Sequence, residues 1–351
     1  MLKLERDTLH FSFPEIHEQA TLSVTFQRTL RIPDDDKTYP LPPGLGNFPM
    51  KLIDEFRERV PANWVEHGGV MLPMYQSEAL WISFRSPHIS DRNTRYPFAV
   101  KVATGKVSAV TGKEWKEGLT EKDYLVVPPQ PWLDGYVVKE GEIRQFIAAP
   151  LGWGFTAEEQ ITEKAEHGGL QIEVFPMDPK VFDEKFPKIE RDFSGRGRRG
   201  MAGIRLSSRR SRHMMRGCNA VTADMGLAPG GKMKQQIFKD THGLDAWKTS
   251  ARARCFVHLA NSLAWRAITG QEAPATPITA ETYTNSKYPW FDHYRDDVEA
   301  LGGTEKLADL KSVLEMGFQK GLNILPENVS CDPENVVVIQ GDPGEVRVGV
   351  W

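Results

Sequence analysis

Short runs in which apolar and polar residues alternate fill the first half of this 351-residue sequence. In Thr21–Arg31 every second residue from Leu22 to Phe26 is apolar, and Leu170–Phe175 repeats the pattern. Alternation sends successive side chains to opposite faces, which is typical of half-buried β-strands. About nine such runs, separated by Gly- and Pro-rich turns, predict that residues 1–187 form a β-rich body shaped like a sandwich or a barrel.

Residues 218–351 mix helical and strand patterns. Asn261 is expected to cap a helix, and Trp290–Leu301 and Glu305–Gly317 have the apolar spacing of helices. Arg254–Leu259 is typical of a buried strand. Because its strands are too few for an independent sheet, this portion is expected to pack on the same body. The predicted fold class is α+β, with a β-rich body and a mixed α/β C-terminal portion.

A basic segment rich in Arg, Gly and Ser, residues 188–217, lies between these two parts. It holds ten basic and two acidic residues, a net charge of +8, whereas the whole chain carries −3. This composition predicts a linker or a surface loop. Nucleic acid is one candidate partner, although no aromatic residues are interleaved for base stacking and the rest of the chain is net acidic. An acidic protein partner is the other, and six arginines would contact it: Arg196, Arg198, Arg199, Arg209, Arg210 and Arg212.

The number of cysteines and the lengths of the apolar runs indicate in which cellular compartment the protein is expected. Cys218, Cys255 and Cys331 are too few and too scattered for a disulfide framework, and no pair has the CxxC spacing of a zinc site. The sequence starts without the apolar core of a signal peptide, and no apolar run is long enough to span a membrane. We expect a cytosolic protein that does not enter membranes, and no cofactor or metal is signalled.

Two small groups of titratable residues have plain structural explanations. Cys255 and His258 supply a thiol and an imidazole, but three positions apart on a strand they point to opposite faces. A core thiol and a buried histidine are therefore expected. A divalent metal ion could bind on one face of a helix to four residues, although solvated helix charges explain them as well: Asp292, His293, Asp296 and Asp297.

Gly226–Met233 matches the pattern G-x4-G-K but has Met233 where a phosphate-binding loop needs Ser or Thr. The hydroxyl of Ser or Thr binds Mg²⁺ in such a loop, so the sequence lacks one of the groups that a phosphate-binding loop needs. Gly230, Gly231 and Lys232 are still candidates for binding an anion, because consecutive backbone N–H groups can form a concave nest. The alternative is a plain Gly-rich turn that precedes a short helix.

A four-residue motif, Glu-His-Gly-Gly (EHGG), occurs twice. Glu66–Gly69 precedes the apolar run VMLPM, and Glu166–Gly169 precedes LQIEVFPM. The two histidines would face one site if the fold were duplicated. The alternative is a coincidence, because glycine suits the left-handed residue that ends a helix and nothing outside this window repeats.

Several segments together resemble a family of uncharacterised microbial proteins. These are IRQFIAAPLGWGFTAEEQITEKAEHGGLQIEVFP (143–176), MGLAPGGKMKQQIFKD (225–240), CFVHLANSLAWRAITG (255–270) and YPWFDHY (288–294). Some members carry a ubiquitin-like module beside such a core, and this sequence shows none. The resemblance implies a compact shared core over most of the chain outside the basic segment. It supplies no catalytic residues and no activity.

Three functions are compatible with these patterns. The first is a non-catalytic cytosolic protein that binds a protein partner or a small ligand. It is preferred because the sequence contains no GxSxG, HExxH, kinase or dinucleotide-binding motif. The second is an enzyme with a dispersed site, acting on a phosphorylated small molecule near Gly230, Gly231 and Lys232. The third is an RNA- or DNA-associated protein that uses the arginine-rich segment.

Overall fold

One large sheet dominates the computed structural model, which describes residues 1–189, 224–293, 295, 298–322 and 328–339. Along the central path of this sheet every neighbouring pair is antiparallel. The path runs through β2 (Thr8–Ser12), β3 (Thr21–Thr29), β8 (Ala79–Arg85), β16 (Glu142–Pro150), β18 (Asp224–Lys234), β19 (Ala253–Ala260), β17 (Leu170–Pro176), β11 (Phe98–Thr104) and β13 (Leu125–Val127).

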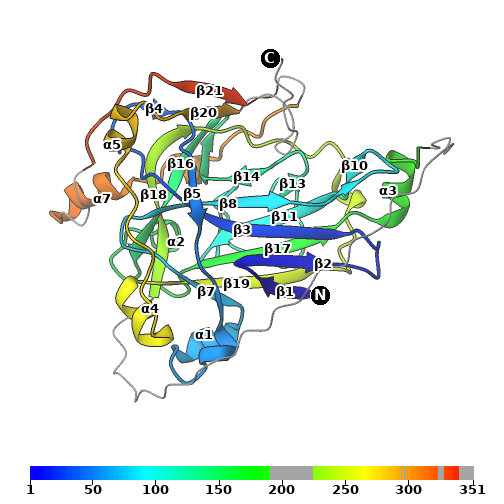
Figure 1. The fold of residues 1–351 in the computed structure, drawn as a ribbon, viewed down its shortest axis with the longest axis horizontal. Coiled ribbons are helices and arrows are strands. Elements are labelled where there is room, and N and C mark those ends of the chain that lie inside the picture. The colour runs from blue at the N-terminus through cyan, green and yellow to red at the C-terminus, as the bar shows by residue number, and fades with distance from the viewer. Residues whose placement is uncertain (190–223, 294, 296–297, 323–327, 340–351) are drawn as a thin grey trace, which may run out of the picture.

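The sheet changes direction at one end of the molecule. Figure 1 shows β3, β8, β11, β17 and β19 running across the view, while β16 and β18 cross them. Side chains from both sides of this bend share one core, to which Phe26, Val100, Ile172 and Val257 all belong. The sheet therefore folds back on itself around that core. The predicted α+β class with a β-rich body is confirmed.

Short strands extend the sheet at its edges. Most pair antiparallel, whereas β4 pairs parallel to β18 and β7 pairs parallel to β19. These strands are β1 (Leu2–Glu5), β4 (Thr38–Tyr39), β5 (Gly44–Asn47), β6 (Lys51–Leu52), β7 (Val70–Pro73), β12 (Val107–Ser108), β14 (Trp132–Leu133) and β15 (Gly135–Lys139). Two further pairs stand apart: β9 (His88–Ile89) with β10 (Thr94–Arg95), and β20 (Trp290–His293) with β21 (Val336–Ile339).

The helices are short, and α2, α3, α4, α5 and α7 begin at a residue whose side chain caps them, whereas α1 and α6 have no side-chain cap. Thr156 and Glu159 form a capping box at the start of α2, and Asn261 caps α4 through the backbone N–H of Ala264. The α-helices are α1 (Ala62–His67), α2 (Ala157–Thr162), α3 (Pro179–Lys185), α4 (Ser262–Thr269), α5 (Ala280–Asn285), α6 (Glu305–Ala308) and α7 (Val313–Lys320), and the 3-10 helices are Ile53–Phe56 and Leu244–Ala246.

Two predicted helices were wrong. Trp290–Leu301 begins with strand β20, whose backbone pairs in parallel with Val336–Ile339. The single helix predicted over Glu305–Gly317 is divided into α6 and α7, because Ser312 forms a capping box with Glu315 and starts a new helix there.

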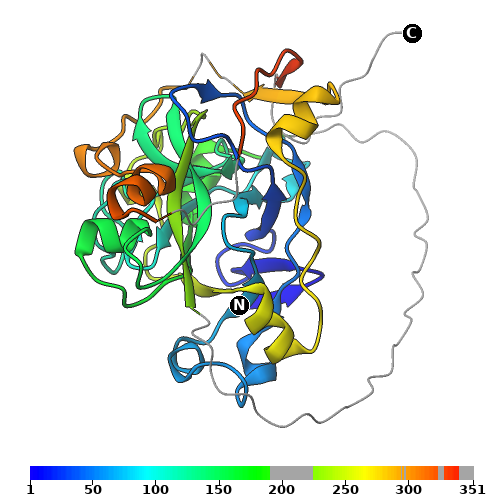
Figure 2. The same ribbon diagram turned by 90° about the vertical axis from the view of Figure 1, so that its left-hand side faces the viewer.

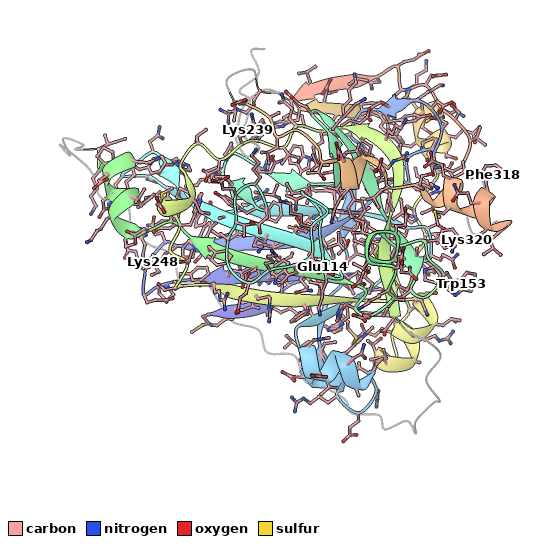
Figure 3. All side chains as sticks on the ribbon, turned by 180° about the vertical axis from the view of Figure 1, so that it is seen from behind. Glu114, Trp153, Lys239, Lys248, Phe318 and Lys320 are labelled. Carbon is pink, nitrogen blue, oxygen red and sulfur yellow. The ribbon has the colours of Figure 1, made fainter. Side chains whose placement is uncertain are left out.

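Helices cover two regions of the surface. In Figure 2, α1 (light blue) and α4 (yellow) lie together at one end, and Trp64 of α1 packs with Trp265 of α4. At the edge labelled in Figure 3, Lys320 of α7 donates a hydrogen bond to the Trp153 carbonyl at 2.8 Å. None of the helices in the described residues has the length and apolar composition needed to cross a membrane.

Candidate functional site

Strand β19 carries the central side chains of the site. Alternation along the strand turns Arg254, Phe256 and His258 to one face. The residues between them face the main core, where the thiol of Cys255 is buried. The prediction that Cys255 and His258 lie on opposite faces of a strand is thus confirmed.

The two EHGG turns lie on opposite sides of β19. Strand β7 follows the first turn and pairs in parallel with β19, which places Val70 beside Val257. Strand β17 follows the second turn and pairs antiparallel, which places Leu170 beside the same Val257. The two turns therefore lie close together, as the first interpretation required. The strands that follow them pair with β19 in opposite senses, so the structure does not show the duplicated fold on which that interpretation was based.

The second glycine of each turn lets the chain approach β19 closely. Gly69 has φ +83°, and a Cβ added to it would lie 2.2 Å from the carbonyl oxygen of Phe256. Gly169 has φ +58°, and its Cβ would lie 2.5 Å from the carbonyl oxygen of Val257. Any other residue would combine a disfavoured φ with a clash against backbone. The glycines therefore set how near the histidines come to β19.

The rings of this region form a connected group. His67 stacks on Phe256 with ring centroids 4.8 Å apart, and it meets His167 edge to face at 6.2 Å. On its other side His67 lies 6.3 Å from His258. The guanidinium of Arg254 lies 5.0 Å from the centre of the Phe256 ring. Three imidazoles from three separate segments thus surround one small volume.

His258 is held as a neutral imidazole. It is 6% exposed, its ring stacks on Trp64 at 4.7 Å, and Nε2 lies 3.0 Å from the Gly68 carbonyl oxygen. Because a carbonyl oxygen only accepts, Nε2 carries the proton. Burial lowers the pKa of His258 to about 4, although the hydrogen bond to Gly68 acts in the opposite direction. His258 thereby fixes the first EHGG turn next to His67.

Glu158 holds the second turn. It follows Thr156, the cap of α2, and its buried carboxylate accepts hydrogen bonds from three backbone N–H groups: Lys106 at 3.2 Å, His167 at 3.3 Å and Gly168 at 3.1 Å. Burial raises the pKa of Glu158, although these three donors act in the opposite direction. One carboxylate therefore fixes both the turn that contains Lys106 and the turn that contains His167.

The ring of His167 lies beside the carboxylate of the residue before it. Its Nε2 is buried, 3.5 Å from Oε2 of Glu166, and makes no hydrogen bond within the described residues. Burial lowers the pKa of His167, and the positive charge of Lys106 lowers it further.

These side chains line a cavity of about 250 Å³. We call it the EHGG cavity. The indole Nε1 of Trp115, one of its lining residues, is buried and has no hydrogen-bond partner within the described part of the chain. Among the described residues, none that lines the cavity is acidic. The lining residues are His67, Lys106, Trp115, His167, Gly168, Leu170, Gln171, Arg254, Phe256, Val257 and His258.

A second, smaller cavity of about 130 Å³ lies beside β3 and β8. Its lining includes Arg31 and the carboxylate of Glu78. Glu78 is buried, and Arg28 donates two hydrogen bonds to it at 2.9 and 2.7 Å. Because charges of both signs already meet there, this cavity gives less indication of its ligand than the EHGG cavity does.

Gly230, Gly231 and Lys232 do not form the turn that their sequence predicted. They lie within strand β18, where the pairing with β16 is irregular between Pro229 and Lys232. The glycines serve close packing, because a Cβ on Gly231 would lie 2.3 Å from the Pro33 carbonyl oxygen and one on Gly230 would lie 2.4 Å from the Ile147 side chain. Because these residues belong to a strand that pairs with β16, and no helix directly follows them in the described residues, the predicted anion loop and the helix after it were wrong.

The other predicted site residues are not brought together. The six arginines from Arg196 to Arg212 lie outside the described residues, as do Asp296 and Asp297. Asp292 and His293 lie on strand β20 rather than on a helix. Across the described residues, no group of three or more His, Cys, Asp or Glu side chains is placed to hold a metal ion.

The sequence offered the two EHGG histidines as one of two open interpretations and His258 only as a buried histidine. It did not single out Lys106, Trp115 or Arg254 as members of the same site. Lys106 belongs to the turn between β11 and β12. The one available signal was the alternation of Arg254, Phe256 and His258, which puts a cation and two rings on one strand face.

No protein-family model, curated protein or solved structure matches this chain. The resemblance to a microbial family therefore remains a prediction.

Proposed function

We propose that this protein binds a small anionic ligand in the EHGG cavity. The observation that carries the proposal is the lining itself. It combines the charges of Lys106 and Arg254 with three imidazoles, and it includes no carboxylate. Two carboxylates lie just outside: Glu158 accepts hydrogen bonds from backbone N–H groups, and Glu173 is paired across the strands with Arg254.

The two cations of the cavity, Lys106 and Arg254, are both exposed. The guanidinium of Arg254 lies 5.0 Å from the centre of the Phe256 ring, and the backbone N–H of Lys106 donates to Glu158. An arginine that already packs on a ring loses less conformational entropy when a ligand binds. An ion pair between exposed groups contributes about 0–1 kcal/mol. We therefore expect weak binding that favours an anion over a neutral ligand of equal size.

The proposal develops the small-ligand half of the preferred sequence hypothesis. The other half, an acidic protein partner for the arginine-rich segment, concerns residues outside those the structure describes. Nucleic acid as a partner of that segment, and a cytosolic location, likewise remain predictions.

Isothermal titration calorimetry with pyrophosphate tests the proposal. Pyrophosphate is small, highly charged and rigid enough to report on the cations alone. We expect binding to the unmodified protein, and Lys106→Gln and Arg254→Gln should each weaken it by about 2-fold to 5-fold. Lys180→Gln is the matched control, because Lys180 is an exposed lysine on α3 that does not line the cavity.

The salt dependence of the affinity separates the cavity from nonspecific attraction. Affinity should fall as ionic strength rises, and the slope should be shallower in Lys106→Gln than in Lys180→Gln. Equal affinities of the Lys106, Arg254 and Lys180 variants would contradict the assignment of the ligand to this cavity.

A further inference from the structure

Two polar side chains in the lining of the EHGG cavity are almost fully buried. Gln171 on β17 is 5% exposed, and His258 on β19 is 6% exposed. Gln171 pairs with Phe256 across the two strands, and His258 follows Phe256 by two residues, so both side chains lie on one face of the sheet. Such diagonal neighbours are about 7–8 Å apart, which is within the reach of one small ligand.

Each of these two side chains is held by a hydrogen bond to a glycine carbonyl. Nε2 of Gln171 donates to Gly105 at 2.7 Å, and Nε2 of His258 lies 3.0 Å from the Gly68 oxygen. The other polar atom, Oε1 of Gln171 or Nδ1 of His258, is therefore an acceptor. Neither acceptor has a hydrogen-bond partner in the described part of the chain, and neither is enclosed by protein, so both are open to the cavity.

The two cations of the cavity lie beside the Gln171 acceptor. Gly105, whose carbonyl holds Gln171, directly precedes Lys106 in the turn between β11 and β12. Arg254 precedes Phe256, the strand partner of Gln171, by two residues and lies on the same face of β19. A charged group that contacts Lys106 and Arg254 thus has the Gln171 oxygen next to it.

The acceptors limit which group can accompany the charge, because an acceptor bonds only to an N–H or an O–H. An ammonium group would meet two cations in the lining and no carboxylate, so it is repelled. A neutral hydroxyl group meets no such repulsion. The cavity of about 250 Å³ is also smaller than the roughly 300–1,000 Å³ of sites for drug-sized ligands, so the ligand is small.

We infer that the EHGG cavity binds small organic anions in which a hydroxyl group lies beside the charged group. This inference rests on the anion-binding function proposed above and names its ligand class. The charged group contacts Lys106 and Arg254, and the neighbouring hydroxyl donates to Oε1 of Gln171. A second hydroxyl, where the ligand has one, donates to Nδ1 of His258. Burial lowers the pKa of His258 to about 4, which keeps Nδ1 an acceptor at neutral pH.

Tartrate and succinate form a matched pair of probes, because they have the same chain length and charge and differ only in two hydroxyl groups. Isothermal titration calorimetry at neutral pH should give an affinity about 3-fold to 10-fold higher for tartrate, the contribution of a neutral hydrogen bond. Glycerol 3-phosphate and propyl phosphate are the corresponding pair with a phosphate. A preference for the hydroxylated member in one pair alone supports the inference and identifies the charged group as carboxylate or phosphate.

Gln171→Met removes the acceptor and nearly keeps the size of the side chain. It should lower the affinity for tartrate to that for succinate, whereas a purely structural defect would weaken both ligands alike. Gln319→Met is the matched control and should keep the unmodified preference, because Gln319 is exposed on α7 and does not line the cavity. Melting temperatures show whether each variant is folded. If Gln171→Met is not folded, the preference of the unmodified protein and the displacement of tartrate by pyrophosphate decide the question.

The outcomes separate this inference from the proposed function. Binding of pyrophosphate and succinate without a preference for either hydroxylated probe would overturn the inference and leave anion binding standing. Failure of pyrophosphate and of all four organic anions to bind would overturn both. A folded Gln171→Met that keeps the full preference for tartrate would also overturn the inference.

Discussion

Val70 and Leu170 pair with the same residue, Val257, from the two sides of strand β19. Each is the first residue after an EHGG turn, so this shared register brings both turns to one height along the strand. A register shift of one residue in β7 or β17 would move a histidine away from the cavity. It would also move the side chains of that strand to the opposite face of the sheet. The register of two strands, rather than any local contact, is what assembles the candidate site.

The close approach of Gly69 and Gly169 to β19 predicts that neither tolerates a side chain. An alanine at either position combines a positive φ with a Cβ 2.2 or 2.5 Å from a backbone oxygen that is fixed in the sheet. Gly69→Ala and Gly169→Ala should each lower the free energy of unfolding by about 2–4 kcal/mol in urea titrations. Gly270→Ala is the control, because Gly270 has φ +70° but nothing within 4 Å of the added Cβ. It should cost only about 1 kcal/mol, and an equal loss in all three would contradict the packing argument.

Glu158 is predicted to keep two loops in place at once. Oε1 accepts from the N–H of Lys106, and Oε2 accepts from those of His167 and Gly168. Glu158→Gln keeps one acceptor oxygen, which can serve one of the two turns, and places an NH₂ group against the N–H groups of the other. The N–H groups of that other turn are left unpaired, which costs about 1–3 kcal/mol. Hydrogen exchange followed by mass spectrometry should show faster exchange in one of the two turns. Exposed Glu163→Gln should leave both turns unchanged, and unchanged exchange in Glu158→Gln would count against the role of the carboxylate.

Local patterns predicted the strands and helix starts that depend only on neighbouring residues. Alternation identified Leu170–Phe175, and the capping box of Thr156 and Glu159 marked α2, because each signal is complete within a few residues. Trp290–Leu301 failed because the backbone of β20 pairs with Val336–Ile339, a partner distant in sequence. Helix propensity is a weak preference that such pairing overrides.

The glycines show the same limit at the candidate site. Gly230 and Gly231 suggested a loop, yet they lie in strand β18. Their lack of a side chain leaves space for Pro33 and Ile147, which are both far away in the sequence. The repeated EHGG motif was visible, but whether its copies meet depends on the register of both strands with β19. Tertiary register cannot be read from either motif alone.

His258 predicts a loss of stability in mild acid. Its pKa is lowered to about 4 in the folded protein by burial, below the usual 6.5 of an unfolded chain. Between pH 6.5 and 4 the unfolded chain therefore binds a proton that the folded protein does not, so stability falls as the pH falls. The contribution is at most about 3 kcal/mol. The test is His258→Gln, whose amide can still donate a hydrogen bond to the Gly68 carbonyl. In urea titrations, the free energy of unfolding of this variant should fall less between pH 7 and pH 4.5 than that of the unmodified protein. An identical loss in both would refute the assignment.

Asp134 predicts the opposite dependence on pH. Its carboxyl group is buried, accepts a hydrogen bond from Nε2 of Gln235 at 3.0 Å, and has its pKa raised to about 7 by desolvation. Between pH 3.8 and 7 the folded protein keeps a proton that the unfolded chain has released, so this group lowers stability as the pH rises. The full effect, present above pH 7, is at most about 4 kcal/mol.

Asp134→Asn tests this dependence, because asparagine has the same shape, retains the oxygen that Gln235 bonds and does not titrate. The variant should be more stable than the unmodified protein at pH 8 by up to about 4 kcal/mol in urea titrations, and the advantage should shrink toward pH 4 as the folded and unfolded carboxyl groups both become protonated. His258 is present in both proteins, so its own pH dependence cancels from the difference. A difference in stability that stays constant from pH 4 to pH 8 would show that Asp134 does not hold a proton in the folded protein.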